Sequence, residues 1–211
     1  MKKYSILRII ALTLILIPLK VIPILAQNHE FGKYGLKGLT AEQREDLEKG
    51  KVVFYATGSQ KGNASLIEAT IVFNKTPQES WDLLSRTEDQ VKYLDECIDV
   101  WKCPERDGKE VHTIKALFLT FQYGVLFEFQ PEDLYFHWSL DPDYDNDLNR
   151  LEGFWRLYPY GEGKTLARYG SDISVKYVPG WIESIFKKRG VENALLSVKK
   201  YVDSGGEYRK K

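Results

Sequence analysis

Gly153-Phe154-Trp155-Arg156-Leu157-Tyr158-Pro159 is the stretch of sequence that decides the fold, together with two segments further along the chain. These segments are Lys164-Thr165-Leu166-Ala167-Arg168-Tyr169 and a helical run led by Pro179-Gly180-Trp181. In that order they predict two antiparallel strands and a long closing helix. A sheet closed by one helix indicates a hydrophobic cavity rather than a catalytic motif.

Composition limits the classes of function that this chain can have. Its 211 residues suit one domain of ordinary size, and its 30 basic and 30 acidic residues balance. Because no Lys/Arg stripe is interleaved with aromatic residues, nucleic acid is excluded as a partner. The 5 Trp, 13 Tyr and 10 Phe residues either fill a large core or line a ligand cavity, and composition leaves both readings open.

The N-terminus has the pattern of a secretory signal peptide. Lys2, Lys3 and Arg8 precede an apolar run over residues 9–19, and a second apolar stretch ends at Ala26. We expect cleavage near Ala26 and export to the periplasm or the medium. The alternative is an uncleaved membrane anchor, although the uninterrupted run is shorter than the roughly 20 apolar residues that span a bilayer.

Export would place Cys97 and Cys103 in an oxidising compartment. The segment between them looks extended, which would hold the sulfurs about 20 Å apart, so a disulfide needs a sharp turn. We therefore expect two unpaired, half-buried thiols. Neither cysteine has a histidine at the spacing of a zinc site.

The remaining chain divides into a tether, a domain and a tail. Residues 27–39 are polar and rich in glycine, which predicts a tether, and Thr40 with Gln43 and Gly50 predicts a short surface helix. Residues 27–50 therefore precede a ligand-binding domain over 51–203. A polar tail completes the chain over 204–211.

Within the domain, the pattern predicts an α+β fold. Residues 52–57 and 66–73 are expected strands, and two short helices are expected next, from Pro77 and over 90–94. Regularly spaced turn residues then predict an antiparallel meander, giving a sheet of six to seven strands. One face of the meander is apolar, and the opposite face is predicted to be solvated. The solvated face carries Glu128, Tyr135, His137, Ser139, Arg156 and Arg168.

The last helix is expected to run from about residue 179 to 202 and to lie across the sheet. Its apolar residues form two patches that are separated at Arg189-Gly190. A helix that kinks or changes its buried face there would leave space over part of the sheet.

These motifs together resemble the START-like, helix-grip superfamily, with its polyketide cyclase/dehydrase and coenzyme-Q-binding branch as the nearest. The resemblance covers about residues 52–202. It rests on the element order and on the motifs Gly153-x-Trp155-x-Leu157-x-Pro159, Lys164-Thr165, Tyr169 and Val178-Pro179-Gly180-Trp181. It implies a deep apolar cavity between a curved sheet and the last helix, which relatives use for lipids, quinones, polyketides or hormones.

The cavity hypothesis selects nine side chains as ligand contacts, although the same residues would also suit a filled core. They are Tyr123, Val125, Phe127, Phe136, Trp138, Trp155, Tyr169, Trp181 and Ile185.

A catalytic reading would need an acid and a base from among His112, His137, Glu128, Arg156 and Asp172. Alternation sends three of these residues to the solvated face, and no two form a short motif. We therefore assign no catalytic residue.

An acidic segment, residues 141–152, carries oxygen-bearing side chains at the spacing of a calcium loop. Asn146 replaces the usual glycine, and the flanks look like strands, so a loop that joins two strands is the favoured interpretation. The residues of the calcium alternative are Asp141, Asp143, Asp145, Asp147 and Glu152.

The sequence thus predicts an exported, monomeric protein that binds a hydrophobic small molecule such as a lipid, a quinone or a polyketide-like compound. No cofactor and no resident metal are expected, and contact with a membrane would be transient. One alternative is a cyclase or dehydratase acting in the same cavity. Another is a protein-interaction module with a filled core.

Overall fold

The computed structural model describes residues 29–55, 66–116, 119–176 and 180–211, and in the last helix it describes side chains from Gly190 onwards. The predicted signal peptide falls outside these residues, as do the side chains of Trp181 and Ile185. The first domain strand, expected over 52–57, is described as far as Tyr55.

One antiparallel sheet of eight strands forms the body of the molecule, in the order β1-β2-β8-β7-β6-β5-β4-β3. The sheet has one strand more than the predicted six to seven. The expected strand over residues 52–57 is present as β1, whose two residues pair with Thr70 and Ala69 of β2. The strands are β1 (Val53–Phe54), β2 (Ile67–Phe73), β3 (Cys97–Lys102), β4 (Lys109–Ala116), β5 (Leu119–Gln130), β6 (Tyr135–Leu140), β7 (Leu148–Tyr160) and β8 (Lys164–Val175).

Two of the predicted helices begin directly after their capping residues. Thr40 and Gln43 make a complete capping box before one helix, and Thr76 and Glu79 make another before the next. The α-helices are α1 (Ala41–Glu48), α2 (Pro77–Leu84), α3 (Gln90–Tyr93) and α4 (Gly180–Asp203), and short 3₁₀ turns cover Thr87–Asp89 and Pro131–Asp133. The two short helices after β2 and the long C-terminal helix are confirmed.

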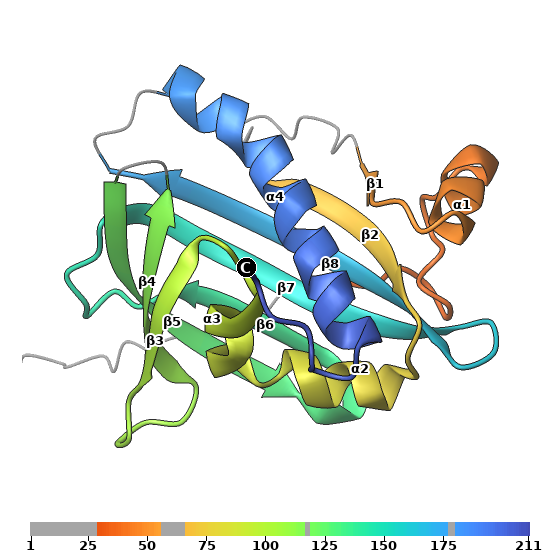
Figure 1. The fold of residues 1–211 in the computed structure, drawn as a ribbon, viewed down its shortest axis with the longest axis horizontal. Coiled ribbons are helices and arrows are strands. Elements are labelled where there is room, and N and C mark those ends of the chain that lie inside the picture. Colours follow the sequence, from red (N-terminus) through yellow and green to blue (C-terminus); the bar gives the residue numbers. More distant parts are fainter. Residues whose placement is uncertain (1–28, 56–65, 117–118, 177–179) are drawn as a thin grey trace, which may run out of the picture.

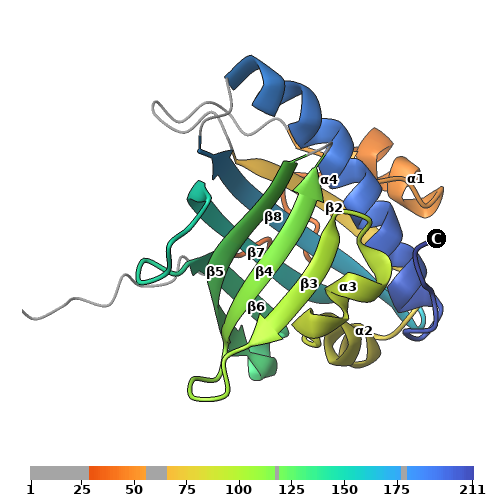
Figure 2. The same ribbon diagram turned by 60° about the vertical axis from the view of Figure 1, so that its left-hand side comes forward.

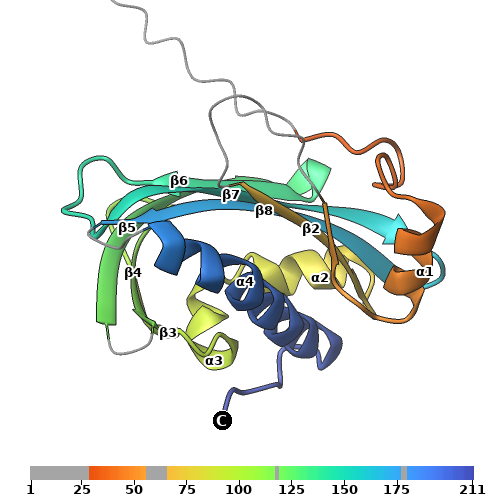
Figure 3. The ribbon, with the colours of Figure 1, turned by 90° about the horizontal axis from the view of Figure 1, so that it is seen from above.

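The sheet is curved, and α4 lies diagonally across its concave face (Figure 1). Viewed from above, α2, α3 and α4 lie on one side of the sheet, and α1 lies near the C-terminal end of β7, where Tyr160 bonds to Glu48 (Figure 3). At the other end, β3, β4 and β5 bend toward the side of the sheet on which α4 lies, and α3 lies beside β3 (Figure 2). This arrangement is a helix-grip architecture, as predicted.

The concave face carries the main core. Phe73, Trp155 and Leu157 pack there against Leu195 and Val202 of α4, all at most 6 % exposed. The apolar alternation predicted for β5, β6 and β7 is therefore confirmed, because this face is covered by the helix.

The convex face differs from the prediction, because Arg168 and Tyr135 are each 1 % exposed instead of solvated. Residues 29–39, predicted to be a tether, pack over this face. Arg168 donates hydrogen bonds from Nε to the carbonyl of Gly35 and from Nη2 to that of Lys37, both at 2.6 Å. The segment is ordered because its backbone carbonyls satisfy a buried guanidinium.

Apolar contacts also hold this segment in place. Leu39 belongs to a second buried cluster with Tyr158 and Leu166, and Phe31 packs against it. The His29 ring stacks on Phe154 with centroids 3.8 Å apart. Sparse apolar residues in a polar, glycine-rich segment are thus enough to dock it.

Acidification is expected to weaken this docking through His29. Burial, then the charges of His137 and Arg156, lower the pKa of His29 from its ordinary value of 6.5. The unfolded chain therefore binds the proton first as the pH falls through 6.5, and the stabilisation present above that pH is lost. Urea unfolding at about pH 7.5 and about pH 5.5 should show a larger loss for the native protein than for His29→Phe, which keeps the stack on Phe154. Equal losses would contradict the role of His29.

Gly153 lets the Trp138 indole lie flat on the sheet. The two residues are cross-strand partners, and a Cβ at position 153 would overlap the Trp138 ring and lie 2.6 Å from the Gly170 carbonyl. Gly153→Ala should therefore lower the free energy of unfolding by about 1–3 kcal/mol in urea titrations. Gly190→Ala is the matched control, since nothing lies within 4 Å of its Cβ, and it should add about 0.5–1 kcal/mol.

Candidate functional site

A cavity of about 190 Å³ lies between the concave face and the helices α3 and α4. Strand residues form one wall, and α4 contributes Ala194, Leu195 and Val198. The space is smaller than a typical ligand pocket of about 300–1,000 Å³, because the aromatic rings of the sheet occupy much of the concave face. Among the side chains that the structure describes, none fills the remaining space.

Seven of the nine predicted contact residues line this cavity, and the other two have side chains outside the described part. The seven are Tyr123, Val125, Phe127, Phe136, Trp138, Trp155 and Tyr169. All of them except Val125 are aromatic, and neighbouring rings lie close together. The centroid of the Tyr169 ring is 4.8 Å from that of Trp155 and 6.0 Å from that of Trp138. The two-residue period placed these side chains on one face, and the curvature of the sheet brings them together.

Phenol groups supply part of the polar lining. Burial raises the pKa of Tyr93, Tyr123 and Tyr169, so that these hydroxyls stay protonated near neutral pH. A protonated phenol can both donate and accept a hydrogen bond. The cavity therefore holds neutral polar groups among its aromatic side chains.

His112 is the one candidate for proton transfer that the structure places at the cavity wall. It is 2 % exposed, and its Nε2 lies 2.8 Å from Oε2 of Glu110, which is 3 % exposed. Thr87 donates a hydrogen bond to the other carboxylate oxygen. Sequence reasoning missed Glu110, although its two-residue spacing from His112 on β4 puts both side chains on one face.

The other catalytic candidates lie away from the cavity. His137 and Glu128 approach each other to 3.5 Å on the convex face, where Arg156 lies over the Tyr135 ring. Asp172 pairs with Arg150, whose Nε lies 2.7 Å from Oδ2 of Asp172. These residues form structural contacts and do not converge with His112.

In the acidic segment, residues 141–147 form a loop between β6 and β7, as favoured from the sequence, and residues 148–152 begin β7. Asp141 pairs with Lys109 at 2.7 Å, and Asp147 accepts a hydrogen bond from the backbone of Gln122. Asn146 accepts a hydrogen bond from the backbone N–H of Gly124 in β5 and donates one to the carbonyl of Asp141. Across the described ranges, no three His, Cys, Asp or Glu residues are placed to hold a metal ion.

Both cysteines are free, as expected from the extended segment between them, which forms β3. Burial raises the pKa of the Cys97 thiol to about 11, so Cys97 is a poor nucleophile near neutral pH.

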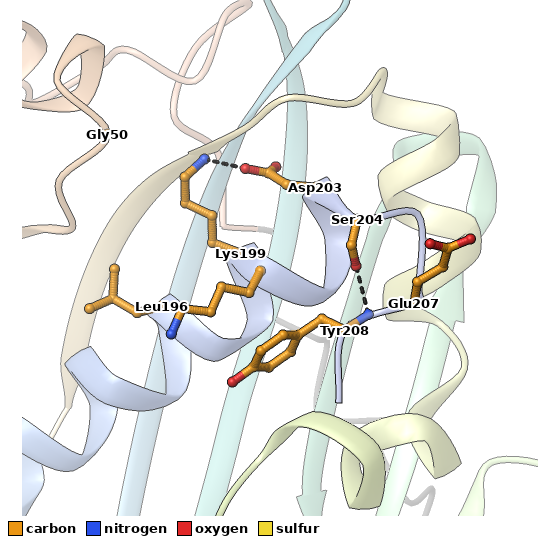
Figure 4. A pocket seen from close by; sticks show the side chains of 8 residues that line it. Gly50, Leu196, Lys199, Asp203, Ser204, Glu207 and Tyr208 are labelled. Atoms are coloured by element: carbon orange, nitrogen blue, oxygen red, sulfur yellow. Dashed lines mark hydrogen bonds and ion pairs between the residues drawn. The ribbon is translucent and has the colours of Figure 1, made fainter. Parts of the chain in front are cut away.

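A wider, open groove of about 690 Å³ lies along the C-terminal end of α4 and the adjoining tail (Figure 4). Within its lining, Lys199 Nζ lies 2.8 Å from Asp203, and Ser204 accepts a hydrogen bond from the backbone of Tyr208. A wide, open groove leaves an apolar ligand in contact with water, so the less open cavity under α4 is the better candidate site.

Among the helices that are described, none combines the length and apolar composition needed to span a membrane.

Comparison with known proteins shows a likeness of fold alone. No protein family model matches the sequence, and no curated protein matches it. A solved structure from Thermus thermophilus is 19 % identical, with a TM-score of 0.58 over 67 % of this chain and 99 % of its own. A START superfamily protein from Mycobacterium smegmatis is 15 % identical, with a TM-score of 0.56 over 67 % of this chain and 99 % of its own.

The Zhui aromatase/cyclase from Streptomyces sp. R1128 is 12 % identical, with a TM-score of 0.55 over 65 % of this chain and 93 % of its own. Each of these structures is matched over nearly its whole length. The chain therefore has the START-like, helix-grip fold.

Proposed function

We propose that this protein binds a small hydrophobic molecule in the cavity between the concave face and α4. The observation that carries the proposal is the unfilled space of about 190 Å³ behind a wall of aromatic side chains. Similar folds include a START superfamily protein and an aromatase/cyclase, which is consistent with a site for an apolar compound. The interaction-module alternative requires a filled interior and is not favoured.

Cavity size limits the ligand. A dry apolar cavity of about 150 Å³ takes up benzene, so this cavity suits one substituted ring or a short branched chain. Burying about 200 Å² of apolar surface contributes about 5 kcal/mol before the cost of association. Single-ring probes should therefore bind with micromolar to millimolar dissociation constants.

Thermal melting with matched probes tests this proposal. At millimolar concentration, 4-ethylphenol and 4-ethyltoluene should raise the melting temperature, because a ligand that binds only the folded state stabilises it. The charged analogue 4-ethylbenzoate should not, since burying its carboxylate is costly. Failure of both neutral probes to raise the melting temperature would refute the proposal.

The second candidate function is a proton-transfer enzyme, such as a cyclase or dehydratase. The paired His112 and Glu110 at the cavity wall favour it, because a histidine oriented by a carboxylate is a suitable general base. Acetophenone in D₂O gives a simple test. If His112 removes an α proton and returns a deuteron, the proton NMR signal of the acetophenone methyl group should decay. This decay should be faster with the native protein than with His112→Phe. Decay at the rate of buffer alone would exclude this activity for acetophenone.

We also propose export after cleavage near Ala26, a monomeric state and transient membrane contact. The sequence supports export through its charged start and short apolar run. Fractionation of cells and the mass of the mature chain would test the cleavage. A full-length chain recovered with membranes would favour the anchored alternative.

A further inference from the structure

The hydrogen bonds around Glu110 fix which nitrogen of His112 carries its proton. Thr87 donates its hydroxyl to Oε1, Lys102 Nζ lies 3.8 Å from the same oxygen, and His112 Nε2 lies 2.8 Å from Oε2. Thr87, Glu110 and His112 are at most 3 % exposed. A carboxylate surrounded in this way acts as an acceptor, so Nε2 of His112 is the donor.

A neutral imidazole that carries its proton on Nε2 has a lone pair on Nδ1. Within the described ranges, Nδ1 of His112 forms no hydrogen bond, and His112 lines the cavity. A ligand that fills the cavity would shield this acceptor from water, and a hydrogen-bond donor on the ligand would replace the lost interaction. The cavity wall therefore contains a hydrogen-bond acceptor of fixed orientation.

We propose that the natural ligand is a hydroxylated apolar molecule, a phenol or an alcohol of about one ring, whose hydroxyl donates to Nδ1 of His112. The proposal rests on the proposed binding function and specifies the class of ligand. A hydroxyl suits the site better than the other donors, because an ammonium or guanidinium group would lose its hydration among aromatic side chains. Ketones and ethers only accept and would leave Nδ1 without a partner.

The position of Tyr123 also suits a ligand that carries a hydroxyl group. Its ring stacks beside that of His112 with centroids 5.7 Å apart, and its side chain also lines the cavity. Because its phenol is a donor as well as an acceptor, a ligand hydroxyl that donates to Nδ1 can also accept from a neighbouring tyrosine.

Calorimetric titration of 4-ethylphenol and 4-ethyltoluene, which differ by hydroxyl against methyl, tests the proposal. For each protein, the affinity for 4-ethylphenol is divided by the affinity for 4-ethyltoluene. This ratio should be at least about tenfold higher in the native protein than in His112→Phe. His137→Phe makes the same substitution on the convex face, and it should leave the ratio unchanged.

The outcomes separate this inference from the proposed function. If both probes bind and the ratio is the same in the native protein and His112→Phe, the hydroxyl inference is wrong while ligand binding stands. If neither probe binds, both are wrong. If His112→Phe does not fold, long-range ¹H–¹⁵N spectra of the native protein decide. A protonated Nε2 and an Nδ1 resonance that shifts with 4-ethylphenol but not with 4-ethyltoluene support the inference, and a protonated Nδ1 overturns it.

Discussion

Arg168→Met is expected to lower the free energy of unfolding by about 2–4 kcal/mol. The substitution removes two charge-assisted hydrogen bonds, to Gly35 and Lys37, and leaves those carbonyls without their donor. It also removes the guanidinium from between the rings of Phe31 and Tyr55, at 4.4 Å and 4.6 Å from their centroids. Urea unfolding measures the loss, and hydrogen exchange should show residues 29–39 opening.

Arg156→Met is the matched control, because Arg156 is the cross-strand partner of Arg168 on the same face. Arg156 lies over two tyrosine rings, 5.6 Å and 5.9 Å from their centroids, and its loss should cost less than about 1 kcal/mol. Similar losses for the two variants would contradict the view that the N-terminal segment is anchored by Arg168.

Ala194→Phe should weaken the binding of 4-ethylphenol by at least about 100-fold. Ala194 lines the cavity from α4, so a phenyl ring at this position would occupy the space that the ligand needs. Filling a cavity restores lost packing, so the free energy of unfolding should stay the same or rise. Calorimetry and urea unfolding together separate blocked binding from misfolding.

Leu196→Phe is the control for this variant. Leu196 lies two residues further along the same helix and is 36 % exposed on its outer side, so the variant should bind 4-ethylphenol as the native protein does. If a stable Ala194→Phe variant keeps native affinity, the ligand binds elsewhere.

Local patterns were sufficient to predict the concave face. The two-residue alternation of Tyr123, Val125 and Phe127 in β5 and of Phe136 and Trp138 in β6 follows from the geometry of a strand. Helices α1 and α2 start at capping boxes, which can be identified within four residues of sequence. Alternation and capping boxes both depend on residues close together in the sequence, and the structure shows both.

Contacts between distant segments were not predictable in this way. Alternation put Arg168 on the opposite face from Tyr169, but it cannot show that residues 29–39 cover that face. The same limit applies to Thr87, which reaches Glu110 only after the chain has turned back from α2. The volume left under α4 also depends on ring packing that no sequence period encodes.

Crystals of the protein held under xenon test the central claim most directly. Xenon enters dry apolar cavities large enough to hold it. We predict an anomalous xenon peak under α4, between Phe127, Trp155 and Leu195. Side chains packed through that space, with no xenon there, would contradict the claim that the cavity is open to a ligand.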